Sequence, residues 1–147
     1  MALTTDNVID ATSSNRHTVV LEASRRTTHA LPADAPRDPR YASADPDVDR
    51  LWCALSGVAD PELPVSLVDL GLIRDVRRAG DAVEVDVTFT ATACPCMAFI
   101  VQDVRERLLQ EPNVKSVSVR DVWDPPWTTE QMTAHGRALL QSCGVAA

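Results

Sequence analysis

The sequence lacks a long apolar run in its N-terminal part. The longest run there is 19–21, and Arg25 and Arg26 are followed by the polar stretch 27–34. A secretory signal needs roughly 7 to 15 apolar residues after a basic segment, and a membrane-spanning helix needs about 20. We therefore expect neither. Because four cysteines occur without an export signal, we expect reduced thiols and a cytoplasmic protein.

The sequence also has little positive charge. Residues 46–147 carry 15 Asp and Glu against 9 Lys and Arg, and the whole chain has a formal net charge of -7. Proteins that bind nucleic acid neutralise phosphates with clustered Lys and Arg. An acidic domain without a basic stripe therefore argues against a nucleic acid partner.

Large apolar residues are scarce in residues 1–45, and the proline-rich stretch 31–46 closes this arm. Such a segment buries too little apolar surface to offset the entropy of ordering it. We expect a flexible, disordered tail over 1–45 and a single domain over 46–147.

The domain begins with a helix signal. Asp45 is a candidate N-cap, Pro46 suits the first helical position, and Gly57 marks the end. The alternation over 83–90 predicts a half-buried strand with Glu84, Asp86, Thr88 and Thr90 on its polar face. A Gly-Asp turn joins it to a shorter strand over 72–78, so the two strands are expected to be antiparallel.

Three further elements complete the domain. Residues 96–110 have helical spacing, 114–122 form a third strand, and Thr128 with Gln131 forms a capping box for a last helix. The order helix, strand, strand, helix, strand, helix predicts an α+β fold. We expect a small mixed sheet of three or slightly more strands, with the helices packed on one face.

Cys94 and Cys96 flank Pro95 where a strand gives way to a helix. With Pro95 at the first helical position, Cys94 becomes the N-cap and Cys96 the second helical residue. The positive end of the helix lowers the pKa of a thiol there. The spacing argues against a disulfide, and a closed zinc site lacks ligands, since His135 is the only histidine of the domain. A buried corner remains an alternative to a thiolate pair that binds iron, copper or an iron-sulfur cluster with a partner's help.

Three motifs in this order resemble one known family. They are the stretch ADPELPVSLVDLGLIRDV at 59–76, the strand end at Thr90 followed by Cys94-Pro95, and WDPPWTTEQM at 123–132. Together they resemble the iron-sulfur cluster assembly domain family that includes the phenylacetate-degradation D protein and the T accessory protein of the SUF system. Three separated motifs are far more specific than a lone Cys-Pro pair.

The resemblance implies a domain similar to the C-terminal domain of NifU-like scaffolds. It implies an accessory factor, rather than an enzyme with turnover, that assembles, matures or delivers iron-sulfur clusters. A cluster or iron would be bound transiently. The expected partners are assembly scaffolds and apo-clients, with no membrane and with a homodimer as one possibility. A metal-free adaptor, dedicated for example to one multicomponent oxygenase, is the alternative.

The resemblance also assigns site residues. The acidic motif of the family falls on Asp60 and Glu62, its threonine on Thr90 and its reactive cysteine on Cys94. These four are expected to share one surface pocket, and Cys96 is an additional thiol that would share the metal or cluster. The alternatives are purely structural roles, in which Asp60 caps a turn and the Thr90 hydroxyl forms a hydrogen bond with the backbone.

The WDPPW stretch suggests a different kind of function. Trp123 and Trp127 flank a rigid turn that contains Asp124, and exposed rings held this way make a protein-docking anchor. Packing of the two rings against the sheet is the commoner arrangement. Cys53 and Cys143 are interpreted as incidental thiols that pack like small apolar side chains.

Overall fold

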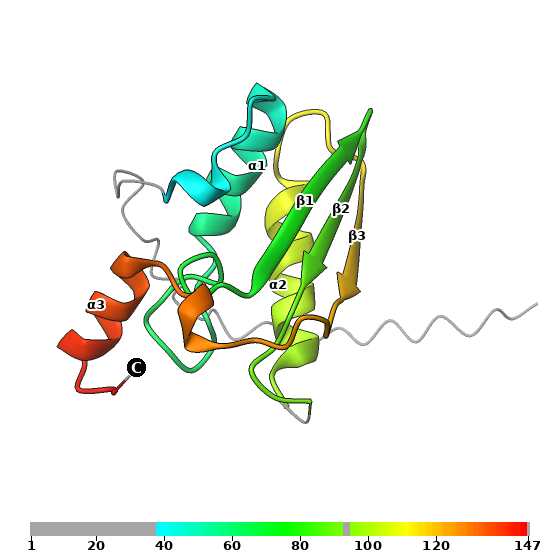
Figure 1. Cartoon of the computed structure of the whole chain (residues 1–147). Helices are drawn as coiled ribbons and strands as arrows, with labels where there is room; N and C mark the ends of the chain where they lie inside the picture. The colour runs from blue at the N-terminus through cyan, green and yellow to red at the C-terminus, as the bar shows by residue number, and fades with distance from the viewer. Residues whose placement is uncertain (1–37, 93–94, 147) are drawn as a thin grey trace, which may run out of the picture.

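The computed structural model of the chain describes residues 38–92 and 95–146 (Figure 1). Its elements are η1 (Pro39–Tyr41), α1 (Pro46–Ser56), β1 (Ile73–Ala79), β2 (Ala82–Val87), α2 (Met97–Leu109), β3 (Ser116–Asp121), η2 (Thr129–Gln131) and α3 (Ala134–Ser142). The predicted order and the α+β class are confirmed, with two short 3-10 helices added. None of the helices in the described part is long and apolar enough to cross a membrane.

The three strands form one mixed sheet in the order β1-β2-β3. β1 and β2 are antiparallel, as the turn between them predicted, and β3 runs parallel to β2. A parallel neighbour requires a crossover connection, and α2 provides it. Figure 1 shows α1 and α2 behind the same face of the sheet, and no helix of the described residues covers the other face.

The core lies between this sheet and the two helices. Val83, Val85 and Val87 alternate along β2 and are at most 1% exposed, because each points toward the helices. The buried face of α2 consists of three residues at helical spacing that are at most 2% exposed: Ile100, Val104 and Leu108. The apolar alternation predicted for this strand is therefore confirmed.

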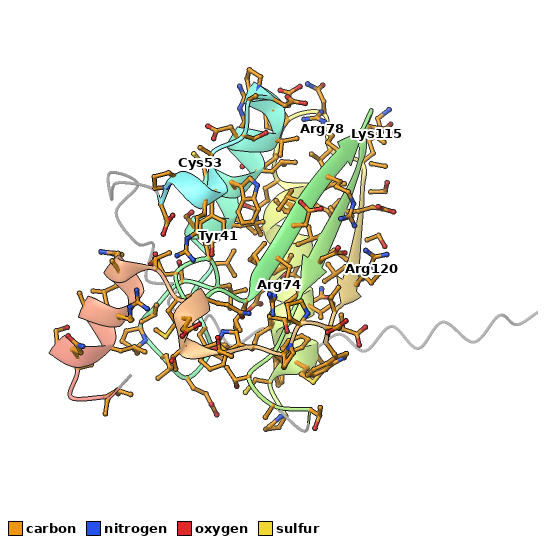
Figure 2. The ribbon with its side chains drawn as sticks, viewed as in Figure 1. Tyr41, Cys53, Arg74, Arg78, Lys115 and Arg120 are labelled. Carbon is orange, nitrogen blue, oxygen red and sulfur yellow. The ribbon has the colours of Figure 1, made fainter. Side chains whose placement is uncertain are left out.

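The outer face of β2 differs from the prediction. Glu84 and Thr90 are exposed, but Asp86 is only 7% exposed and Thr88 is fully buried. Two arginines from the neighbouring strands cover Asp86, and each donates two hydrogen bonds of 2.8 to 3.0 Å to its carboxylate: Arg77 of β1 and Arg120 of β3. Figure 2 shows Arg120 on this side of the sheet. The burial of Asp86 could not be predicted from the alternation within one strand, because its two partners lie on the neighbouring strands.

The two guanidinium groups lower the pKa of Asp86 to about 2. Hydrogen bonds from Arg77 make the largest contribution and those from Arg120 the next, and together they outweigh burial, which raises the pKa. Asp86 therefore links the three strands through paired charges on the face opposite the core.

The helices α2 and α3 both begin at other residues than the sequence predicted. Cys96 is the N-cap of α2 and Met97 its first helical residue, so Pro95 precedes the helix and does not open it. The proposed N-cap, Cys94, lies outside the described residues. The last helix begins at Ala134, where the Thr133 hydroxyl accepts a 2.9 Å hydrogen bond from the Gly136 N–H.

The Thr128 and Gln131 capping box was wrong, since Thr128 makes no side-chain capping hydrogen bond and precedes the short η2. A contact distant in sequence explains the later start. The Thr133 hydroxyl donates a 2.6 Å hydrogen bond to Asp69, and the Thr133 N–H donates to the Asp69 carbonyl at 2.9 Å. Asp69 therefore fixes Thr133, the N-cap residue of α3.

Asp69 is itself fixed within its own loop. The Ser66 hydroxyl donates to its second carboxylate oxygen at 2.8 Å and accepts from its N–H at 3.0 Å. Gly136 passes so close that a Cβ there would lie 2.6 Å from the Asp69 carbonyl oxygen. The loop before β1 and the start of α3 are thereby held in contact.

Residues 38–45, which the sequence interpretation assigned to the tail, contact the domain. The Tyr41 ring lies 4.8 Å from the Trp52 ring of α1, measured between centroids. Arg40 Nη2 donates a 3.3 Å hydrogen bond to the Met132 carbonyl. The rest of the arm, 1–37, lies outside the described residues, so the division into a tail and a domain stays a prediction.

Replacing Asp86 by Asn should destabilise the protein by about 2 kcal/mol at pH 7, because the lowered pKa of Asp86 favours the folded state. The stabilisation is complete above the unfolded-state pKa near 4 and disappears as the pH falls toward 2. Urea unfolding across this pH range measures it. Glu84→Gln, on the same face but exposed, is the control and should change stability little. An Asp86→Asn penalty that persists undiminished at pH 2 would contradict the charge argument.

Thr133→Val should cost about 1 to 2 kcal/mol, because it removes both the helix cap and the hydrogen bond to Asp69. Thr128→Val tests the rejected capping box and should be nearly neutral. Thermal unfolding of the two variants beside the native chain provides the comparison. A larger loss at Thr128 than at Thr133 would restore the earlier helix start.

Candidate functional site

A cavity of about 180 Å³ lies where β2 ends, α2 begins and the segment after β3 crosses the loop before β1. Most of its wall is apolar. Among the wall residues are Leu70, Leu72, Phe89, Ile100, Met132 and Leu140. Its polar lining residues include Asp60, Glu62, Thr90 and Cys96. The structure thus brings to one cavity four residues that are separated in the sequence by up to 36 positions.

Asp60 holds the loop that forms one side of this cavity. Its Oδ1 accepts hydrogen bonds from the N–H groups of Glu62 at 2.8 Å and Leu63 at 3.0 Å. Its own N–H donates to the Val65 carbonyl at 2.9 Å. Asp60 therefore caps a turn, as one interpretation held, and the same turn places the exposed Glu62 on the cavity lining.

Thr90 and Cys96 also line the cavity, and they come from the end of β2 and the start of α2. Thr90 follows β2 and is exposed, while Cys96 is half-buried at the N-terminus of α2. The carbonyl of Cys96 accepts the 3.0 Å hydrogen bond from the Ile100 N–H that opens the helix. Cys94, expected in the same pocket, lies outside the described residues, and its place there stays a prediction.

The described residues form no complete metal site around Cys96. Within 38–92 and 95–146, no group of three or more His, Cys, Asp or Glu side chains is placed to hold a metal ion. His135 is exposed on α3, and Cys53 is exposed on α1, where Figure 2 shows it. The described side chains thus provide one thiol and two carboxylates along the cavity, without a closed coordination shell.

The two tryptophans of WDPPW both pack against the core. The Trp123 indole N–H donates to Asp121 at 3.0 Å, and its ring lies 5.7 Å from the Phe89 ring between centroids. The Trp127 indole N–H donates to the Leu70 carbonyl at 2.9 Å, and its side chain lines the cavity. Asp124 is exposed and precedes Pro125 in a cis peptide bond. A partner-binding role for these residues stays a prediction.

The sequence did not predict the contribution of two residues, Trp127 and Asp69, to the cavity. Trp127 was considered only as a packing or docking ring, yet it forms part of the wall. Asp69 was not singled out, although it fixes the segment that carries Met132 and Leu140. The only signal for Asp69 was its place in the SLVDLG stretch, because its partner Thr133 lies 64 positions further along.

Comparison with known proteins agrees with the motifs. The sequence model of the family described as "Iron-sulfur cluster assembly protein" matches residues 49–119. The chain is 40% identical over 93 residues to the Fe-S protein maturation auxiliary factor YitW of Bacillus subtilis (strain 168), which covers 63% of this chain and 91% of YitW. It is 36% identical over 84 residues to the Fe-S protein maturation auxiliary factor SufT of Staphylococcus aureus (strain USA300), covering 56% and 96% of the two chains.

A solved structure supports the same assignment. The crystal structure of a domain of unknown function, DUF59, from Bacillus anthracis superposes with a TM-score of 0.60 at 36% identity. The match covers 63% of this chain and 90% of that one. The expected fold and resemblance are thus both confirmed, and the chain belongs to the iron-sulfur cluster assembly protein family.

Proposed function

We propose that this protein is a cytoplasmic accessory factor in the maturation of iron-sulfur proteins, and that it receives iron or a cluster transiently before a client takes it. The observation that carries the proposal is the position of Cys96. It stands at the N-terminus of α2 on a cavity that Asp60, Glu62 and Thr90 also line. The names of the relatives, both maturation auxiliary factors, support the same role.

The local chemistry suits a temporary ligand site. The N-terminal end of the 13-residue α2 favours a thiolate over a thiol. Thiolates are the preferred ligands of iron-sulfur clusters, and Cys94 with Cys96 provides two, which leaves further positions open. A partner can complete the coordination shell and then remove the cluster. The carboxylates of Asp60 and Glu62 offer hard oxygen ligands for iron beside the sulfurs.

The proposed partners are assembly scaffolds, which bring iron or a cluster, and apo-clients, which receive it. The surface turn at 123–127 lies next to the cavity through Trp127, so a partner bound over the turn reaches the cavity edge. Asp124 and Pro125 are exposed there. In this role the protein binds and releases its cargo without chemical turnover of a substrate.

Anaerobic reconstitution tests the ligand assignment. Native chain, Cys94→Ser and Cys96→Ser are loaded with iron and sulfide, and bound iron, sulfide and visible absorbance are compared. Each serine variant should lose about half or more of the bound cluster, since a serine oxygen is a poor substitute for thiolate sulfur. Cys53→Ser is the matched control, because Cys53 is an exposed thiol on α1 that does not line the cavity.

Equal iron and sulfide contents in the native chain and both variants would refute direct ligation by these cysteines. The metal-free adaptor would then account for the family membership. Loss of cluster in Cys53→Ser as well would show that loading is non-specific, which also counts against the site.

A further inference from the structure

The cavity has the character of a peptide-binding pocket as well as of a ligand site. Its interior is built from leucine, isoleucine, phenylalanine and methionine side chains, while Asp60 and Glu62 are its charged lining residues. A volume of about 180 Å³ is sufficient for one aliphatic or aromatic side chain, given that cavities of about 150 Å³ hold benzene. An occupant that complements this lining has an apolar side chain with basic residues nearby.

The charge of the chain is distributed unevenly. Residues 38–147 carry 17 Asp and Glu against 10 Lys and Arg, which accounts for the whole net charge of -7. Residues 1–37 carry four of each sign and are neutral as a whole. Any segment of the arm with an excess of positive charge is therefore attracted to the acidic domain.

The arm contains one such segment, RHTVVLEASRR at 16–26. It combines the three large aliphatic residues 19–21 with three arginines against a single glutamate. The arginines at its end are Arg25 and Arg26, four and five positions after Leu21. These are the apolar and basic groups that complement the cavity lining.

The arm also joins the domain close to the cavity wall. The described chain begins at Asp38, and Arg40 two residues later donates a hydrogen bond to the carbonyl of Met132, which lines the cavity. The 16 residues between Leu21 and Asp38 span up to about 55 Å when extended. A domain of about 100 residues has a radius of gyration near 13 Å, so this length is ample. Tethering gives such a segment an effective concentration near the millimolar range.

We propose that the segment 16–26 of the same chain is a ligand of this cavity, with Leu21 or a neighbouring valine inside it and Arg25 and Arg26 beside its acidic residues. The bound segment covers Cys96 and competes with a client for the cavity. The arm is then a built-in competitor that a client displaces. The regulatory consequence rests on the proposed function, whereas the binding itself does not.

Methyl NMR of the full-length chain tests the binding. The chain has only three isoleucines and three methionines, so the signals of Ile100 and Met132 are readily assigned. Ile73 is buried outside the cavity lining and is the internal reference. Leu21→Asp should shift the Ile100 and Met132 signals and leave Ile73 in place, because a carboxylate is excluded from an apolar, acidic cavity.

Leu3→Asp is the matched control, since it makes the same change in the arm outside 16–26. The Ile100 and Met132 signals of this variant should coincide with those of the native chain. A peptide of residues 16–26, added to the Leu21→Asp chain, should move the two signals back toward their native positions in a saturable way. The same peptide with Leu21→Asp should not. Alkylation of Cys96 should be several-fold faster in the Leu21→Asp chain than in the native one.

Identical Ile100 and Met132 signals in the native and Leu21→Asp chains would overturn the proposal and leave the cavity to a separate partner. If the Ile100 and Met132 signals of the native chain changed on dilution, the occupant would be a second copy of the chain, and the proposal would be overturned. Failure here is distinguishable from failure of the proposed function, because Leu21→Asp retains both Cys94 and Cys96. Its cluster loading reports on the ligand site alone.

Discussion

The central strand β2 buries three valines on its inner face and one carboxylate, Asp86, on its outer face, and the rest of the architecture follows from this constraint. Its three valines pack against α1 and α2, and its Asp86 is enclosed by arginines from β1 and β3. A buried carboxylate is tolerated only where it is paired, so both outer strands must hold their register with β2. Phe89 and Thr90, which directly follow this strand, are thereby fixed where α2 starts, and they form one side of the cavity.

The other side of the cavity depends on Asp69. It joins the loop before β1 to the start of α3 through Ser66 and Thr133. The residues before and after Thr133, Met132 and Leu140, then reach the cavity wall. Two separate anchors thus determine the site, one at the end of β2 and one at Asp69. Cys96 lines the same cavity at the N-terminus of α2, so the thiol lies at the positive end of a helix next to an apolar pocket.

The mixture of thiol, carboxylates and apolar wall is informative about function. A structural metal centre has a closed set of protein ligands, whereas cargo that must leave is better held by a few ligands beside a surface that a protein partner can occupy. In the cavity, Trp127 and Met132 form part of an apolar wall that Cys96 also lines, which is the arrangement that the proposed function needs. Ligand exchange and partner binding at one place would couple the arrival of a client to release of the cargo.

Local rules were enough for much of this fold. The Asp45-Pro46 start of α1, the valine alternation of β2, the hairpin with β1 and the mixed sheet followed from neighbouring residues, and three motifs identified the family. Tertiary structure decided the burial of Asp86, the start of α3 at Thr133, and the position of Trp127 in the cavity wall. The physical reason is common to all three. Each depends on hydrogen bonds or packing between residues 34 to 64 positions apart, and the periodicity of a sequence records only contacts within a few positions.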